Sequence, residues 1–429
     1  MAQRKFKKIT FGNGLRIVLV PQPASPATTV LILVEAGAEY ETKKINGLSH
    51  FLEHMMFKGT VNRPKPGQVG EEIASLGAQT NAFTSYEYTG YWAKAEYKKL
   101  PKILEIVSDL YLNPIFNPEE IEKEKGVVIE EINMRRHDNP AGDVQENFIS
   151  LLYGDQPAGW DVAGRESIIR NLKREDFQAY RGKHYVSSKT IVVVSGNFSE
   201  KFVTKAIRSY FGGLKRKPRF PKSKTIEPPQ KKPALVTKFK ETGQSHIALG
   251  VRAFNLFDKR RYATEVLAHV LGSYSSMSSR LFKKVREEMG AAYHIDAGVD
   301  LYLDHGYLLV SAGVDHKKVE AVVKVVLEEM ARLKEELVGD SELQKSKDHI
   351  IGNMLLGLET SDQLASFYGS QEVLEGKILR PEDLIGKIKK VRAEELRSVA
   401  REIFKDEKLN LAVIGPYKNK DVFKKLLKF

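Results

Sequence analysis

Two histidines and a glutamate fall within five consecutive positions of the stretch INGLSHFLEHMMFKGT, residues 45–60. On a helix, His50 and His54 would lie one turn apart and could direct both imidazoles at one Zn²⁺ ion. Glu53 would share their face and could take a proton from a water molecule that attacks a carbonyl, then pass that proton to the leaving amine. The order H-x-x-E-H is the inverse of the H-E-x-x-H metal-binding motif. The pattern is therefore a candidate for metal-assisted hydrolysis.

The surrounding residues predict the helix that would carry this motif. Asn46 is the expected N-cap and Gly59 the expected stop, so the helix should cover residues 47–57. The three polar residues of the motif would lie opposite an apolar stripe at helical spacing. That stripe consists of Leu48, Phe51, Leu52 and Met55. The alternative is an exposed amphipathic helix that carries two solvated histidines.

A catalytic zinc ion needs a third protein ligand and one open position. The chain has no cysteine, so the third ligand should be a histidine or a carboxylate. The best candidate helix begins at NPEEIEKEKGVVIEEINMRR, with Asn117 as N-cap, Pro118 in the first turn and Glu120 closing a capping box.

Three glutamates on this second helix are candidates for the site. Glu124 and Glu131 are seven residues apart and almost share a face, whereas Glu130 lies about 100° from Glu131 around the axis. Of two carboxylates two turns apart, one could bind a metal and the other could orient a second metal ligand by a hydrogen bond. The alternative is an acidic helix surface exposed to solvent.

The order of the expected elements repeats along the chain. In the first half, strand-like RIVLVPQP and TTVLILVEAGAEYE precede two helices, the strand-rich QTNAFTSYEYTGYWAKAE and a helix over residues 98–112. In the second half, strand-like HIALGVRAF precedes helices over KRRYATEVLAHVLG and SRLFKKVREEMG. Strand-like AYHIDAGVDLYL and GYLLVSAGV and the long helix HKKVEAVVKVVLEEMARLKEEL follow. We therefore predict an α+β fold with an internal duplication, in which each copy has an antiparallel-rich sheet packed with helices. The second copy has ATEVLAH in place of HFLEH and lacks the paired ligands.

The chain of 429 residues is long enough for two domains. Its middle, KRKPRFPKSKTIEPPQKKPALVTK, is rich in proline and lysine and has no sustained apolar periodicity, which is typical of a linker. We predict a first domain over residues 1–214, a linker over residues 215–233 and a second domain over residues 234–429.

The overall charge and hydropathy argue against nucleic-acid and membrane partners. The net charge is +13, but lysine and arginine are spread along the chain and mixed with glutamate, which favours a solvated surface over a nucleic-acid footprint. The basic N-terminus lacks the apolar core of a secretory signal, and no apolar run approaches the length of a membrane span. A cytoplasmic location is therefore the expectation.

The motifs together resemble the pitrilysin-like zinc peptidases, a family that includes insulin-degrading enzyme and the mitochondrial processing peptidase. The resemblance rests on HFLEH, EKEKGVVIEEI, GAQTNAFTSYEYTGYWAKA and LLYGDQPAGWDVAGRESI, and it covers nearly the whole chain. It implies one Zn²⁺ per chain, with His50, His54 and Glu131 as ligands. Glu124 would be the associated acidic residue, and Glu130 becomes the less favoured ligand.

The same resemblance implies how a peptide substrate would bind. The segment Asn81-Ala82-Phe83-Thr84 would form an edge strand on which an extended peptide adds as a further strand. In the second half, VREEMGAAYHIDAG resembles the segment that clamps the substrate, and it places Arg286 and Tyr293 where they would bind the peptide carbonyl.

The length resembles that of the short family members, in which two chains form a clamshell. We therefore expect a zinc endopeptidase that cuts unfolded peptides in an enclosed chamber, as a homodimer whose sites are completed in trans. Two alternatives remain: a peptidase that removes presequences, and a non-catalytic scaffold of the kind found in respiratory-complex core subunits. The intact ligand set argues against the scaffold.

Overall fold

The computed structural model describes residues 5–273 and 277–429, which form two compact units. The described residues of the first unit come from Met1–Ile132, Asp161–Ser223 and Leu355–Arg380. Those of the second come from Asn133–Trp160, Lys224–Met354 and Pro381–Phe429. Each unit thus includes one segment from the other half of the chain. The predicted domain limits at residues 214 and 234 follow the duplicated sequence and stay a prediction.

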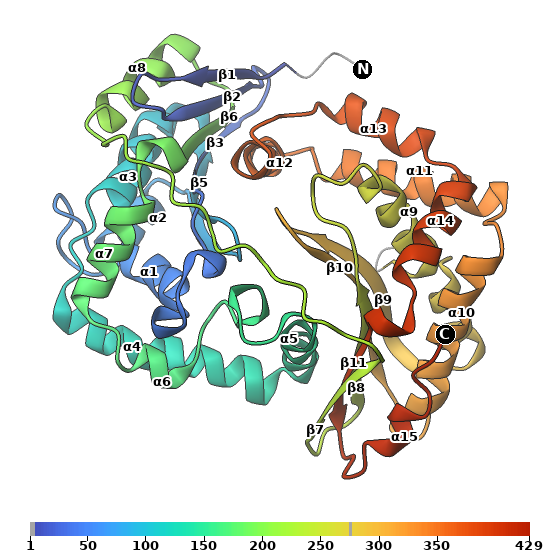
Figure 1. Cartoon of the computed structure of the whole chain (residues 1–429). Coiled ribbons are helices and arrows are strands. Elements are labelled where there is room, and N and C mark those ends of the chain that lie inside the picture. The colour runs from blue at the N-terminus through green and yellow to red at the C-terminus, as the bar shows by residue number, and fades with distance from the viewer. Residues whose placement is uncertain (1–4, 274–276) are drawn as a thin grey trace. The chain divides into compact units, whose positions relative to one another are not determined.

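The first unit is built on one mixed sheet (Figure 1). Among its described residues the strand order is β1-β2-β6-β3-β5-β4, in which β2 and β6 are parallel and all other neighbours are antiparallel. The strands are β1 Lys7–Thr10, β2 Arg16–Pro21, β3 Ala27–Val34, β4 Gln79–Thr84, β5 Thr89–Glu96 and β6 Thr190–Gly196. The helices are α1 Leu48–Met56, α2 Gln68–Ser75, α3 Leu100–Leu112, α4 Pro118–Asn133, α6 Glu166–Ile169, α7 Arg174–His184, α8 Glu200–Phe211 and α12 Ser361–Leu374.

The almost continuous apolar run of β3 follows from its position between two layers of helices. Its even-numbered residues, such as Ile32, join the core cluster that includes residues of α1 and α3. Its odd-numbered residues face α12, where a Cβ on Gly369 would lie 2.8 Å from Cδ1 of Leu33 and 3.1 Å from Cγ2 of Val193. A strand covered on both faces needs apolar residues at every position, and Gly369 allows α12 to approach the sheet closely.

The second unit has a sheet of its own, with the order β7-β11-β8-β10-β9 among its described residues. Here β7 and β11 are parallel and the other neighbours antiparallel. The strands are β7 Ala234–Phe239, β8 Ser245–Arg252, β9 Ala292–Leu301, β10 Gly306–Val314 and β11 Leu409–Gly415. The helices are α5 Pro140–Tyr153, α9 Arg261–Leu271, α10 Val319–Glu335, α11 Asp340–Leu356, α13 Pro381–Lys390, α14 Ala393–Ile403 and α15 Asp421–Lys424; α11 continues into the first unit.

The two sheets share one topology, which confirms the predicted α+β fold and its duplication. The order β2-β6-β3-β5-β4 corresponds to β7-β11-β8-β10-β9, with the parallel pair at the same place in both. Every residue of β8 is buried, as is every residue of β3 except Ala27. In β8, Ile247, Leu249 and Val251 join the core cluster of α9 and α10, while Ala248 joins residues of α5. No helix among residues 5–273 and 277–429 is both long and apolar enough to cross a membrane.

The structure refines one local prediction and contradicts another. The stretch SRLFKKVREEMG was expected to be a helix, and Phe282–Glu288 is helical in the form of a π-helix, η7. The α1 helix begins at Leu48 with Gly47 as N-cap, so the prediction of Asn46 as N-cap was wrong. The reason lies outside the helix: the NH₂ group of Asn46 donates to a carboxylate oxygen of Glu41 and to the Asp161 carbonyl, and the N–H of Ser49, which an Asn46 cap would bind, donates to Glu41 instead.

Part of the predicted linker is fixed to the first unit. Lys222 forms ion pairs with Glu39 and Glu87, and all three side chains are almost fully buried. Arg219 pairs with Glu35 nearby. Residues 215–223 therefore lie along the first unit as an anchored segment.

Candidate metal centre

The α1 helix is held in place by a carboxylate from outside it. Glu41 accepts hydrogen bonds from the backbone N–H groups of Gly47 at 2.8 Å and Ser49 at 2.6 Å, at the N-terminus of α1. Gly47 has φ +95°, and a Cβ there would lie 2.6 Å from the carbonyl oxygen of Ala163, so only glycine fits this turn. Burial raises the pKa of Glu41 to about 7, against the opposing effect of the N–H bonds.

The two faces of α1 have different roles. Leu48, Phe51, Leu52 and Met55 are completely buried in the core of the first unit. His50 is also buried, and the side chain of His54 is only 19% exposed, so these histidines are not the solvated pair of the alternative reading.

The α4 helix brings Glu131 to the two histidines. Its Oε2 atom lies 3.4 Å from Nε2 of His50 and 3.4 Å from Nε2 of His54. Candidate donor atoms of the three residues all lie within 4.8 Å of one another, whereas Glu130 is exposed and does not belong to this group. Asn117 and Pro118 start the helix as predicted, because the Asn117 side chain accepts from the N–H of Glu119 at 2.9 Å and α4 begins at Pro118.

The three residues fit a zinc ion both in chemistry and in spacing. Two imidazole nitrogens and one carboxylate form one of the common catalytic zinc ligand sets. Zinc binds such atoms at about 2.1 Å, and a tetrahedron of that radius has edges of about 3.4 Å. The two distances to Oε2 of Glu131 match that edge. His50, His54 and Glu131 are therefore able to hold the metal with one coordination position open.

A second carboxylate orients one of the histidines. Oε1 of Glu124 lies 3.0 Å from Nδ1 of His54, and Oε2 lies 2.5 Å from Nζ of Lys58. Burial works against ionisation of Glu124, but the bonds to His54 and Lys58 prevail and lower its pKa. Burial alone would lower the pKa of His54, but Glu124 and Glu131 raise it to about 9. The Nδ1 atom of His50, in contrast, is buried without a hydrogen-bond partner among the described residues.

Glu53 lies between His50 and His54 in the sequence, and its side chain forms a hydrogen bond with the edge strand β4. Its Oε2 atom accepts a hydrogen bond from the hydroxyl of Thr84 at 2.6 Å. Thr84 ends β4, which pairs with β5 on one side and forms the edge of the described sheet. Asn81, Ala82 and Phe83 precede it on the same strand, so the structure brings the predicted peptide-binding strand next to the predicted base.

Arg286 and Tyr293 lie beside each other in the second unit. The Arg286 guanidinium is 4.9 Å from the centre of the Tyr293 ring and 4.9 Å from that of Phe282. Tyr293 is 82% exposed at the start of β9, the edge strand that corresponds to β4. A cation and a phenol thus form one exposed pair, as expected for residues that contact a ligand.

The sequence interpretation missed Lys58 and Glu41. Lys58 follows His54 by four residues, just past the end of α1, so helical spacing alone would have placed it near the motif. Its partner Glu124 comes from a different helix, and Glu41 reaches the N–H of Gly47 from six residues earlier, outside the helix that it caps. No local pattern signals such contacts.

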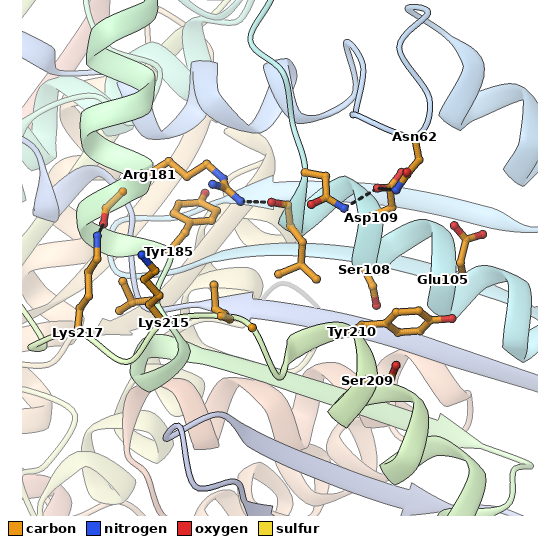
Figure 2. Close-up of a pocket in the computed structure, with 16 residues that line it drawn as sticks. Asn62, Glu105, Ser108, Asp109, Arg181, Tyr185, Ser209, Tyr210, Lys215 and Lys217 are labelled. Atoms are coloured by element: carbon orange, nitrogen blue, oxygen red, sulfur yellow. Dashed lines mark hydrogen bonds between the residues drawn. The ribbon is translucent and has the colours of Figure 1, made fainter.

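A cavity of about 550 Å³ in the first unit is lined by none of these metal-centre residues (Figure 2). Arg181 points a guanidinium nitrogen at the carbonyl of Leu112, 2.6 Å away at the end of α3. Lys217 donates to the carbonyl of Gly182 at 2.7 Å, and Asp109 is bound by neighbouring side chains. Arg181 and Lys217 therefore already bind carbonyls near helix ends, and Asp109 already binds side chains of a neighbouring loop.

Comparisons with known proteins agree with this geometry. The family model described as Insulinase (Peptidase family M16) matches residues 16–165, and the model of the Peptidase M16 inactive domain matches residues 171–350. The uncharacterized zinc protease YmxG of Bacillus subtilis is 33% identical over 413 residues, which are 96% of this chain and 99% of that protein.

Solved structures of similar fold cover the same length. A protease from Helicobacter pylori has a TM-score of 0.91 at 25% identity and covers 96% of this chain and 100% of its own. A peptidase M16 inactive domain from Pseudomonas fluorescens has a TM-score of 0.87 at 16% identity, covers 96% of this chain and 98% of its own, and supports the fold alone. The chain therefore belongs to peptidase family M16, the pitrilysin-like zinc peptidases that its HFLEH motif resembles.

Proposed function

We propose that this chain is a zinc endopeptidase in which His50, His54 and Glu131 hold one zinc ion and Glu53 is the general base. The observation that carries the proposal is the donor set, because both imidazole nitrogens lie 3.4 Å from one carboxylate oxygen on a different helix. If the histidines lay on a surface helix by chance, no carboxylate oxygen would be expected 3.4 Å from both of them, which is the edge length of a zinc tetrahedron.

The chemistry follows from what surrounds the three proposed ligands. Zinc held by His50, His54 and Glu131 would polarise the scissile carbonyl and lower the pKa of a neighbouring water molecule. Glu53 takes a proton from that water as its oxygen attacks the carbonyl carbon. When the C–N bond breaks, Glu53 gives the proton to the leaving nitrogen and returns to its ionised form. Glu124 does not touch the reacting atoms in this scheme and acts as a positioning residue for His54.

The substrate class follows from the strand beside the base. The outer side of β4, Gln79–Thr84, is unpaired within the described sheet, and its backbone groups are able to pair with any extended peptide. A peptide that is already folded cannot offer its backbone in this way, so the substrates are unfolded chains. Arg286 and Tyr293 would bind the carbonyl of such a peptide and stabilise the charge that develops on it.

We further propose that two chains form a clamshell around an enclosed chamber. The clamp of each chain, which consists of Arg286 and Tyr293, would act on the zinc-binding domain of the other chain. A presequence-processing peptidase would bind basic peptides and would need an acidic binding surface. The net charge of +13 favours the general endopeptidase.

The test compares wild type with Glu53→Gln on a mixed peptide library, with zinc content measured in parallel. We expect about one zinc per chain in both proteins and hydrolysis by wild type alone, because the amide cannot take the proton. Loss of zinc in Glu53→Gln would mean that the residue holds the metal site together and is not its base. A wild type with neither zinc nor activity would favour the non-catalytic scaffold.

A further inference from the structure

The hydroxyl of Thr84 lies at the junction of the two parts of the proposed site. Thr84 is the last residue of β4, and its Oγ1 atom donates to Oε2 of Glu53 at 2.6 Å. The other acceptor within reach, the carbonyl of Ser49, is 3.5 Å away. A hydroxyl has one proton to donate, so the short bond to the carboxylate takes it.

This bond restricts how Glu53 can point. A glutamate side chain has three rotatable bonds, and fixing one carboxylate oxygen removes most of the freedom of the other. Oε1 of Glu53 has no hydrogen bond to the described residues, so it is the oxygen left for a water molecule. The bond is charge-assisted, which makes it stronger than a bond between neutral groups.

We propose that Thr84 is a positioning residue for the general base: its hydroxyl holds Oε2 of Glu53 so that Oε1 faces the attacking water. The inference rests on the proposed function and deepens it. The strand that would bind the substrate and the group that would activate water are then joined by a single hydrogen bond. Thr84 contributes to the rate of the chemical step more than to the affinity for the peptide.

The experiment uses the full chain with Thr84→Val, which keeps the shape and removes the donor, and Thr84→Ser, which restores it. We expect kcat to fall about 10- to 100-fold in Thr84→Val, with KM within about twofold of wild type and zinc content unchanged. Thr84→Ser should recover most of kcat. A peptide should bind Glu53→Gln and Glu53→Gln/Thr84→Val with Kd values within about twofold, a measurement that needs no turnover.

Thr28→Val is the matched control. Thr28 lies on β3 of the same sheet, outside the proposed site, and its hydroxyl donates to the backbone carbonyl of Asn197 at 2.8 Å. Its substitution removes a strand hydroxyl without touching Glu53 or β4, so kcat should stay near that of wild type. An equal loss in Thr28→Val and Thr84→Val would show a general defect of the sheet and overturn the inference.

The remaining outcomes separate this inference from the proposed function. If Glu53→Gln is inactive while Thr84→Val keeps full kcat, the role of Thr84 is wrong and the proposed function stands. The same follows if Thr84→Val mainly raises KM or loses zinc. If Glu53→Gln retains activity, or wild type has none, the proposed function fails and the role of Thr84 fails with it.

Discussion

Lys58, Glu124 and His54 form a short chain of charged groups that ends at a proposed zinc ligand. Lys58 binds Oε2 of Glu124, which leaves Oε1 for Nδ1 of His54. An imidazole that donates from Nδ1 presents Nε2 without a proton, which is the form that binds a metal. The corresponding atom of His50 lacks such a partner among the described residues. Of the two proposed histidine ligands, His54 is therefore the one whose ring is oriented by a hydrogen bond at Nδ1.

The first prediction concerns Lys58. We expect Lys58→Met to weaken zinc affinity about 10- to 100-fold, because Glu124 loses the cation that keeps it ionised and in place. Lys58→Arg should retain most of the affinity. Competition with a chelator measures the zinc affinity of each variant. The control is Lys123→Met, which removes a lysine from an exposed ion pair with Glu120 on the same helix as Glu124. Equal zinc affinity in Lys58→Met and wild type would contradict the role of Lys58.

A buried histidine makes the stability of the first unit depend on pH. His184 is 2% exposed and packs against the rings of Tyr40 and Tyr180. Burial, with Lys189 and Lys183 nearby, lowers its pKa to about 3. The unfolded chain, with a pKa of about 6.5, binds more protons below that pH than the folded one does. The contribution of His184 to stability is therefore full above about pH 6.5 and is lost as the pH falls toward 3.

The second prediction follows from this loss of stability at low pH. Between pH 7 and pH 5, wild type should lose about 2 kcal/mol more stability than His184→Phe, whose ring does not titrate. Urea unfolding of both proteins at the two pH values measures the difference. All other histidines are shared by the two proteins, so their titration cancels in the comparison. The same pH dependence in both proteins would mean that His184 is protonated in the folded state.

At the scale of the element, the α1 helix depends on Glu41. Its carboxylate binds the N–H groups of Gly47 and Ser49, and the negative charge also suits the positive end of the helix dipole. A helix that starts with a glycine as N-cap has no side-chain cap of its own, so this contact from an earlier segment replaces it.

The third prediction is that Glu41→Gln destabilises the protein by about 1 to 3 kcal/mol at pH 8, where the carboxyl group is ionised. The amide keeps one acceptor, but its NH₂ group then faces a backbone N–H. Glu71→Gln is the control, since Glu71 is an exposed acidic residue in the first turn of α2. Urea unfolding compares the two variants. A loss as small as that of the control would show that water can replace the Glu41 cap.

Local sequence spacing predicted the helices of the site but not the contacts that they make. The α1 and α4 helices were predictable because their apolar and polar positions separate at a local spacing of 3.6 residues. The N-cap of α1 was not, because the Asn46 side chain bonds to Glu41 and to the distant Asp161, and Glu41 accepts the N–H of Ser49 in its place. The positions of α5 and α12 could not be predicted either. An apolar helix face shows that a helix packs, but it does not show which sheet it packs on.

At the scale of the whole molecule, the two copies of the duplicated fold carry different candidate site residues on the same framework. The edge strands β4 and β9 occupy the same place in the two sheets, and each has a candidate functional residue at one end. Thr84 at the end of β4 binds the proposed base, whereas Tyr293 at the start of β9 packs with Arg286. The two copies thus carry different side chains at equivalent edge strands: one is bonded to the proposed base, and the other belongs to the proposed substrate clamp.

The final prediction tests whether these edges meet across two chains. In a homodimer that completes its sites in trans, a Glu53→Gln subunit still offers an intact clamp, and an Arg286→Ala/Tyr293→Phe subunit still offers an intact zinc domain. Each heterodimer would then contain one complete site. Random mixing makes half of the dimers heterodimers, so co-expression should give about a quarter of the wild-type activity, although each parent alone is almost inactive. Sites completed in cis would give no recovery, because every chain carries one defect. Native mass spectrometry of the same sample counts the heterodimers, so a sample that contains them and stays inactive would rule out completion in trans.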